Sequence, residues 1–140
     1  AGLPLPACAV AMSPWVDLTC AGESHTSCAD RDPLLTRGVL LEMADQYLLG
    51  QDPRAPLASP VAADLTGLPP LLIQAGADEV LLDDAITLAQ RAEGAGVPTR
   101  LEVWPEMIHV WQMFAGALPE ADEAIGRIAD FLAQMWSQGA

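Results

Sequence analysis

Two side chains, Asp78 and His109, have the types and the spacing needed to share a proton at one site. Asp78 follows an apolar run at residues 71–76, and His109 follows an alternating run at residues 99–104. Their separation of 31 residues (109 − 78) leaves room for a helix and a strand that return the chain beside its starting point. A carboxylate beside an imidazole fixes the ring tautomer and stabilises the imidazolium. The pair is therefore typical of the orienting half of a nucleophilic triad.

Three candidate strands form the frame that must position this pair. Residues 8–14 and 71–76 are nearly unbroken apolar runs, which is typical of strands buried on both faces of a parallel sheet. Residues 99–104 alternate apolar and polar side chains, which predicts a strand at an edge with one face less buried. Functional groups of open α/β sheets gather beyond the carboxyl ends of the strands, so Asp78 and His109 are expected there.

Three helices are predicted from apolar side chains at helical spacing, at about residues 36–50, 83–93 and 120–136. Residues 18–32 are rich in small polar side chains and predict a loop, and the proline-rich residues 51–70 predict an ordered connection. Strands that alternate with helices in this order predict an α/β fold with right-handed crossovers.

Each of the two candidate residues also has a purely structural interpretation. An aspartate after a strand commonly caps a helix or a turn, and Glu79, Asp83 and Asp84 are close enough to compete for the acid role. Asp83 and Asp84 stand where helix-start acids are expected without any catalysis. A lone histidine such as His109 is often a satisfied loop or core residue.

Four segments of the sequence resemble those of one enzyme family. They are, in chain order, SPWVDLT at 13–19, DPLL at 32–35, LPPLLIQAGADE at 68–79 and WPEMIH at 104–109. Together they resemble the C-terminal half of an α/β-hydrolase of the bacterial hormone-sensitive-lipase group of esterases, over nearly the whole chain.

This resemblance implies roles for the residues and the elements. Asp78 would be the triad acid and His109 the triad base of a serine carboxylesterase or lipase-type hydrolase of carboxylic esters. The three strands would be the last three of an eight-stranded sheet, and the excursion at residues 18–50 would belong to the cap over the active site. Nothing in the sequence requires a metal or an organic cofactor, so none is expected.

The sequence departs from the family pattern at the nucleophile. The family places its serine in a G-x-S-x-G turn, and the nearest match here, around Ser24, has Thr26 in place of the second glycine. The HGGG-type oxyanion motif is also absent. We therefore expect residues 1–140 to be a partial α/β-hydrolase domain, a C-terminal fragment that is inactive alone.

Cys20, His25 and Cys28 form the other cluster with possible chemistry. Their spacing, C-x4-H-x2-C, lacks the paired signatures of zinc sites and has no evident fourth ligand, so a metal is not expected. A Cys20–Cys28 disulfide stays open, although three cysteines in a chain of this size favour a reducing compartment.

Composition and charge exclude several classes of partner. The chain has 140 residues, a formal charge of −13 and a sequence pI near 4.1, so nucleic acids and anionic lipid surfaces would repel it. No apolar run reaches the roughly 18 residues of a membrane span, and the opening lacks the basic start of a secretory signal. We expect a soluble, cytoplasmic protein with a small-molecule ester substrate.

A non-catalytic role is the alternative to the esterase. The chain would then be a half-domain that acts in protein interaction or assembly. A strand around Val10 without its neighbour would leave unpaired backbone groups along an apolar edge. On either interpretation we expect this edge to pair with the missing N-terminal half or with a second copy of the chain.

Overall fold

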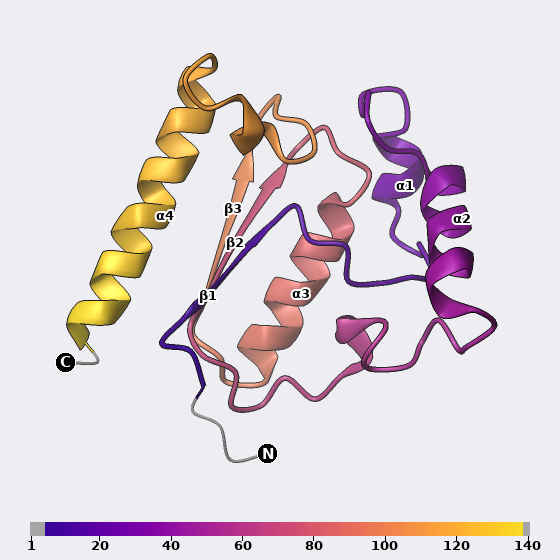
Figure 1. The fold of residues 1–140 in the computed structure, drawn as a ribbon, viewed down its shortest axis with the longest axis horizontal. Coiled ribbons are helices and arrows are strands. Elements are labelled where there is room, and N and C mark those ends of the chain that lie inside the picture. The colour runs from indigo at the N-terminus through magenta and orange to yellow at the C-terminus, as the bar shows by residue number, and fades with distance from the viewer. Residues whose placement is uncertain (1–4, 139–140) are drawn as a thin grey trace.

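The computed structural model describes residues 5–138 as a three-stranded sheet between helical layers (Figure 1). The strands are β1 (Ala9–Met12), β2 (Leu71–Gly76) and β3 (Thr99–Trp104). The helices are α1 (Ser24–Ser27), α2 (Arg37–Leu48), α3 (Leu82–Gly94) and α4 (Pro119–Gln138), with the short 3-10 turns η1 (Pro60–Ala62) and η2 (Trp111–Phe114).

All three strands are parallel and lie in the order β1-β2-β3. Leu71 is opposite both Ala9 and Thr99, so the three parallel strands begin at the same level. Their carboxyl ends therefore point to the same end of the sheet. β2 is buried at every position, as its apolar run predicts. β1 is only half-buried and Met12 is exposed, so the expectation of a strand buried on both faces is wrong for the described residues.

The side chains of β2 alternate between two helical layers. Leu71, Ile73 and Ala75 pack with the apolar stripe of α3. On the opposite face, Gln74 donates a hydrogen bond to the Ala124 carbonyl of α4. Figure 1 shows α3 and α4 on the two sides of the sheet, so the predicted α/β layering is confirmed.

The excursion between β1 and β2 contains more helix than expected. Residues 18–32 were expected to be a loop, but Ser24–Ser27 forms one turn of helix. Its position is fixed by two hydrogen bonds of the Ser24 hydroxyl, which donates to the Val80 carbonyl and accepts from the Asp83 amide. These bonds attach the excursion to the chain that leaves β2.

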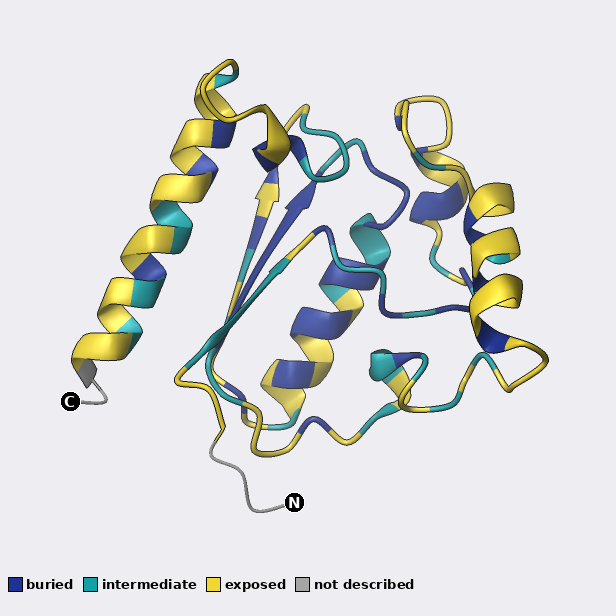
Figure 2. Cartoon of the chain, in the orientation of Figure 1, coloured by how far each residue is buried: buried dark blue, intermediate teal, exposed yellow. Residues whose placement is uncertain are grey.

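Helix α2 buries only half of its apolar positions. Leu40, Ala44 and Leu48 face the protein, whereas Val39, Met43 and Tyr47 are exposed. Figure 2 shows this outer side of α2 as largely exposed. The helix begins as predicted, with the Thr36 hydroxyl accepting from the Val39 amide.

The three cysteines carry free thiols in the described part of the chain, so Cys20 and Cys28 are not joined. Among residues 5–138 there is no cluster of histidine, cysteine and acidic side chains suited to a metal ion. None of the helices described here has the length and apolar character that crossing a membrane requires.

Candidate functional site

His109 and Glu79 form a hydrogen-bonded pair beyond the carboxyl ends of β2 and β3. The Nδ1 atom of His109 lies 2.8 Å from Oε2 of Glu79. The Glu79 side chain is completely buried, while that of His109 is 20% exposed. A carboxylate only accepts hydrogen bonds, so Nδ1 is the donor and Nε2 of the neutral ring is the free base.

The turn after β2 fixes the Glu79 carboxylate from two sides. Its second oxygen, Oε1, accepts a hydrogen bond of 2.8 Å from the Gly76 amide, at the end of the same strand. The next residue, Val80, is buried, and its amide donates to Oδ2 of Asp32 at 2.9 Å. The acid is therefore anchored to β2 and, through its neighbour, to the excursion.

The structure does not bring Asp78 to His109, so the pairing expected from the sequence is corrected. Oδ1 of Asp78 lies 2.9 Å from Nε of Arg31, and both side chains are partly exposed. The Asp78 amide donates to the Met107 carbonyl. Of the two adjacent acids, Glu79 points inward to the ring and Asp78 points to Arg31.

The turn after β2 and the loop that carries His109 are in direct backbone contact next to the Glu79–His109 pair. The Ala77 amide donates to the Trp104 carbonyl at 2.8 Å, which extends the β2–β3 pairing beyond the strands. A Cβ atom built on Gly76 would lie 2.6 Å from the Met107 carbonyl carbon. Only a glycine lets the His109 loop approach β2 this closely.

A buried amide network holds the chain after His109. Gln74 accepts from Nε2 of Gln112 at 2.9 Å and donates to Oε2 of Glu102 at 2.9 Å. Trp111 is fully buried, with its ring centroid 5.6 Å from that of Trp104. Trp111 is core, whereas Met113 and Phe114 are exposed.

A second buried polar cluster lies around Asp84, in the first turn of α3. Its carboxylate accepts from the Val16 and Asp17 amides at 2.8 and 2.9 Å, and lies 3.8 Å from Nε2 of His25. Burial raises the pKa of Asp84 to about 6 and lowers the pKa of His25. Both ring nitrogens of the buried His25 lack a hydrogen-bond partner. This cluster joins the segment that follows β1 to α3 and does not include His109 or Glu79.

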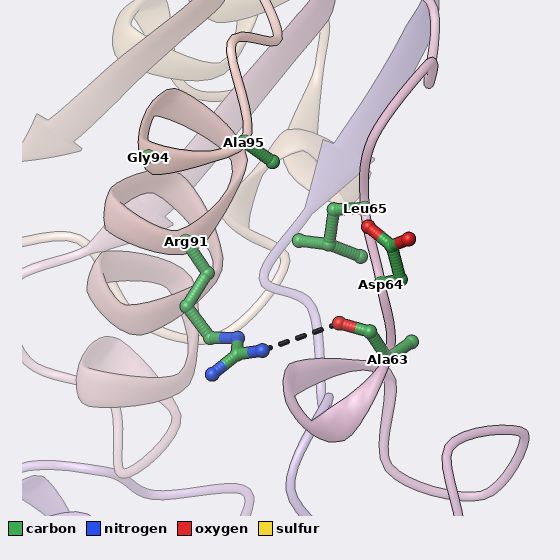
Figure 3. Close-up of a pocket in the computed structure, with 6 residues that line it drawn as sticks. All are labelled: Ala63, Asp64, Leu65, Arg91, Gly94 and Ala95. Carbon is green, nitrogen blue, oxygen red and sulfur yellow. Dashed lines mark hydrogen bonds between the residues drawn. The ribbon is translucent and has the colours of Figure 1, made fainter.

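Figure 3 shows a surface hollow that belongs to neither cluster. It lies between α3 and the segment before β2, where Nη2 of Arg91 donates to the Ala63 carbonyl at 3.2 Å. Gly94 and Ala95, at the end of α3, also line it. Glu79 precedes the start of that 13-residue helix, so the hollow is about 20 Å away from the acid.

The arrangement of the pair is one that suits general base catalysis. Glu79 can orient the imidazole and stabilise its protonated form, while Nε2 accepts a proton from a nucleophile. The sequence singled out His109 and the turn that carries its carboxylate partner. It missed Glu79 as the partner, because choosing between adjacent carboxylates requires the direction in which each side chain points.

Comparisons with known proteins point to one family. A family model described as the alpha/beta hydrolase fold matches residues 1–113. An acetyl-hydrolase of Streptomyces hygroscopicus is 54% identical over 99% of this chain and 46% of its own length. An esterase of Acinetobacter venetianus is 38% identical over 91% of this chain and 42% of its own length.

Solved structures agree with these relatives. An esterase from the bacterial hormone-sensitive lipase family superposes with a TM-score of 0.94 at 53% identity, covering 96% of this chain and 45% of that one. The structure of EstE5 soaked with ethyl alcohol gives a TM-score of 0.95 at 48% identity, covering 97% of this chain and 46% of that one. The chain thus spans less than half the length of these relatives, and its strands match the C-terminal portion of their fold.

Proposed function

The chain belongs to the α/β-hydrolase fold family, and from that membership we propose that it forms the acid–base half of a serine carboxylesterase. The observation that carries the proposal is the 2.8 Å contact between Glu79 and His109. A buried carboxylate on Nδ1 leaves Nε2 at the partly exposed side of the ring, where a nucleophile can reach it. Residues outside the printed sequence would supply the serine.

The proposed reaction has two steps. Nε2 of His109 removes the hydroxyl proton as the serine oxygen bonds to the ester carbonyl carbon, and it then donates that proton to the departing alcohol. Water attacks the acyl-enzyme in the second step, with His109 again taking and returning a proton. Glu79 stays ionised and stabilises the imidazolium in both steps.

The proposed substrates are carboxylic esters with short acyl groups. The acetyl-hydrolase of Streptomyces hygroscopicus, 54% identical to this chain, supports a small acyl group. Residues 18–50 are assigned to the cap over the active site. Hydrogen bonds from Ser24 to Val80 and from Val80 to Asp32 tie this segment to the acid turn. Free thiols at all three cysteines suit a cytoplasmic enzyme.

The partner proposed for the sheet edge is the rest of the enzyme. Within residues 5–138, β1 pairs only with β2, which leaves its other edge open. A strand of the segment that carries the serine would pair there and bring the nucleophile to the same end of the sheet. Pairing with a second copy of the chain is the alternative.

The test is ester hydrolysis by the full-length protein with and without His109→Ala. The proposal predicts that the variant, with an unchanged circular dichroism spectrum, loses turnover of p-nitrophenyl acetate by roughly a thousandfold or more. Equal turnover in both proteins would favour a non-catalytic interaction domain instead.

A further inference from the structure

Ser13, at the end of β1, contacts the backbone directly after His109. Its amide donates to the Gln74 carbonyl at 2.7 Å, which continues the pairing of β1 with β2. Its hydroxyl oxygen accepts a hydrogen bond of 3.0 Å from the Val110 amide, 97 residues further along the chain. Ser13 is buried, so the hydroxyl is shielded from competing water.

Val110 needs such a partner because its backbone is strained. It has φ 46° and ψ 43°, the left-handed region that a β-branched residue rarely adopts. In this conformation the side chains before and after Val110 point to different parts of the protein. His109 before it points to Glu79, and Trp111 after it is fully buried in the core.

Other contacts hold the loop on either side of this point. On the N-terminal side of His109, the Met107 carbonyl accepts a hydrogen bond from the Asp78 amide. On the C-terminal side, the Gln112 side chain donates a hydrogen bond to the Gln74 side chain. Val110 itself has two hydrogen bonds: its carbonyl accepts from the nearby Met113 amide at 3.0 Å, and its amide donates to Ser13 at the end of β1, which links it to a distant segment. The Ser13 hydroxyl acts on Val110, and Ser13 also adopts a positive φ, of 46°, which directs its side chain across to the loop.

We propose that Ser13 is a positioning residue for the base. Its hydroxyl holds Val110 in the left-handed conformation, and this conformation keeps the His109 ring aligned with Glu79. The consequence for catalysis rests on the proposed esterase function. The alignment of His109 with Glu79 is a property of the folded protein and does not depend on that function.

The chain offers a matched control in Ser59. Its buried hydroxyl also accepts from a backbone amide, that of Leu18 at 2.8 Å, and it donates to the Pro53 carbonyl at 2.6 Å. Removing this hydroxyl deletes at least as many hydrogen bonds as removing that of Ser13. Neither contact of Ser59 involves the loop that carries His109.

The experiment compares Ser13→Ala and Ser59→Ala in the full-length protein. The first readout is the NMR signal of the His109 Nδ1 proton, recorded without substrate. The second is kcat for p-nitrophenyl acetate per active site, with sites counted by titration with an organophosphonate. Ser13→Gly is a second variant, because glycine accepts the positive φ and folds even where alanine does not.

Both Ser13 variants should weaken the Nδ1 proton signal and lower kcat per site by roughly ten- to a hundredfold, with KM changed much less. Ser59→Ala should lower the melting temperature but keep the signal and kcat. Adding Val110→Gly to Ser13→Ala should restore part of the kcat, because glycine is not strained there. An unchanged signal in both Ser13 variants would overturn the proposal. If the unmodified protein hydrolyses no ester, the esterase proposal fails, and the NMR comparison still decides the role of Ser13.

Discussion

Gly76 and Met107 lie so close together that a single added carbon would force them apart. A Cβ on Gly76 would lie 2.6 Å from the carbonyl carbon of Met107 and 3.0 Å from the Ile108 carbonyl oxygen. Both neighbours are backbone atoms, so no side chain can move aside. Because of this close approach, the end of β2 packs directly against the loop that contains His109.

Gly76→Ala should therefore displace the His109 loop. We expect a loss of about 1–3 kcal/mol in the free energy of unfolding and a fall in kcat of roughly a hundredfold. Urea denaturation and ester hydrolysis by the full-length protein measure the two effects.

Gly126→Ala is the control for this substitution. Gly126 lies within α4, and a Cβ there would meet no atom within 4 Å. Alanine should stabilise the helix by about 0.5–1 kcal/mol and leave kcat unchanged. Similar stability changes for the two variants would contradict the close approach at Gly76.

Asp84 makes stability depend on pH in a predictable direction. Its pKa rises from 3.8 to about 6 on folding, because burial disfavours the charged form. The folded protein then binds the proton more tightly, so the contribution of Asp84 to stability falls as pH rises from about 4 to about 6. Above about pH 6, the buried Asp84 carboxylate lowers the free energy of unfolding by about 3 kcal/mol. The lowered pKa of His25 acts in the opposite sense, reducing stability as pH falls below 6.5.

Asp84→Asn isolates this effect. The amide oxygen can still accept from Val16 and Asp17, and the amide nitrogen faces His25. Urea denaturation from pH 4 to pH 7 should show the variant gaining stability relative to the unmodified protein, by up to about 3 kcal/mol at neutral pH. A difference that stays constant over this range would argue against a raised Asp84 pKa.

Asp32 anchors the turn that carries Glu79. One of its carboxylate oxygens accepts from Val80, and the other accepts from Leu34 and Leu35. Asp32→Ala leaves the buried Val80 amide unpaired and should cost roughly 2–4 kcal/mol of unfolding free energy, with reduced kcat. Chemical denaturation measures the loss.

The control for Asp32 is Asp64→Ala. Asp64 makes a similar bond to the Thr66 amide, but in an exposed turn. Water can replace that bond, so we expect a loss below about 1 kcal/mol. Equal losses for Asp32→Ala and Asp64→Ala would show that Asp32 does not anchor the acid turn.

The sequence predicted the frame of the molecule well. The strand at 71–76 matches β2, because its apolar run reflects burial along the whole strand. The alternating run at 99–104 matches β3, an edge strand in which buried and exposed positions are mixed. The helix at 83–93 matches α3 to within one residue at each end. The exposed outer stripe of α2 was not predicted, because apolar spacing does not show which stripe has a partner.

The details of the site depend on contacts between distant segments. His109 was found because its type is rare in this chain and it follows a strand. Ser13 carries no signal of its role in the sequence, since its partner, the Val110 amide, is a backbone group 97 residues away. The choice of Glu79 over Asp78 depends on the Gly76 amide and on Arg31, which fix the two carboxylates in different directions.

The central claim is that Glu79, and not Asp78, is the acid that acts with His109. Its most direct test is kcat of the full-length protein with Glu79→Gln and with Asp78→Asn. In Glu79→Gln, the amide oxygen keeps the Gly76 bond and the amide nitrogen faces Nδ1, which shifts the ring proton to Nε2 and blocks the base. We predict a loss of roughly a thousandfold or more for Glu79→Gln. Asp78→Asn removes only a partly exposed ion pair with Arg31 and should keep kcat within about threefold. The reverse order, with Asp78→Asn inactive and Glu79→Gln active, would contradict the assignment of Glu79 as the acid.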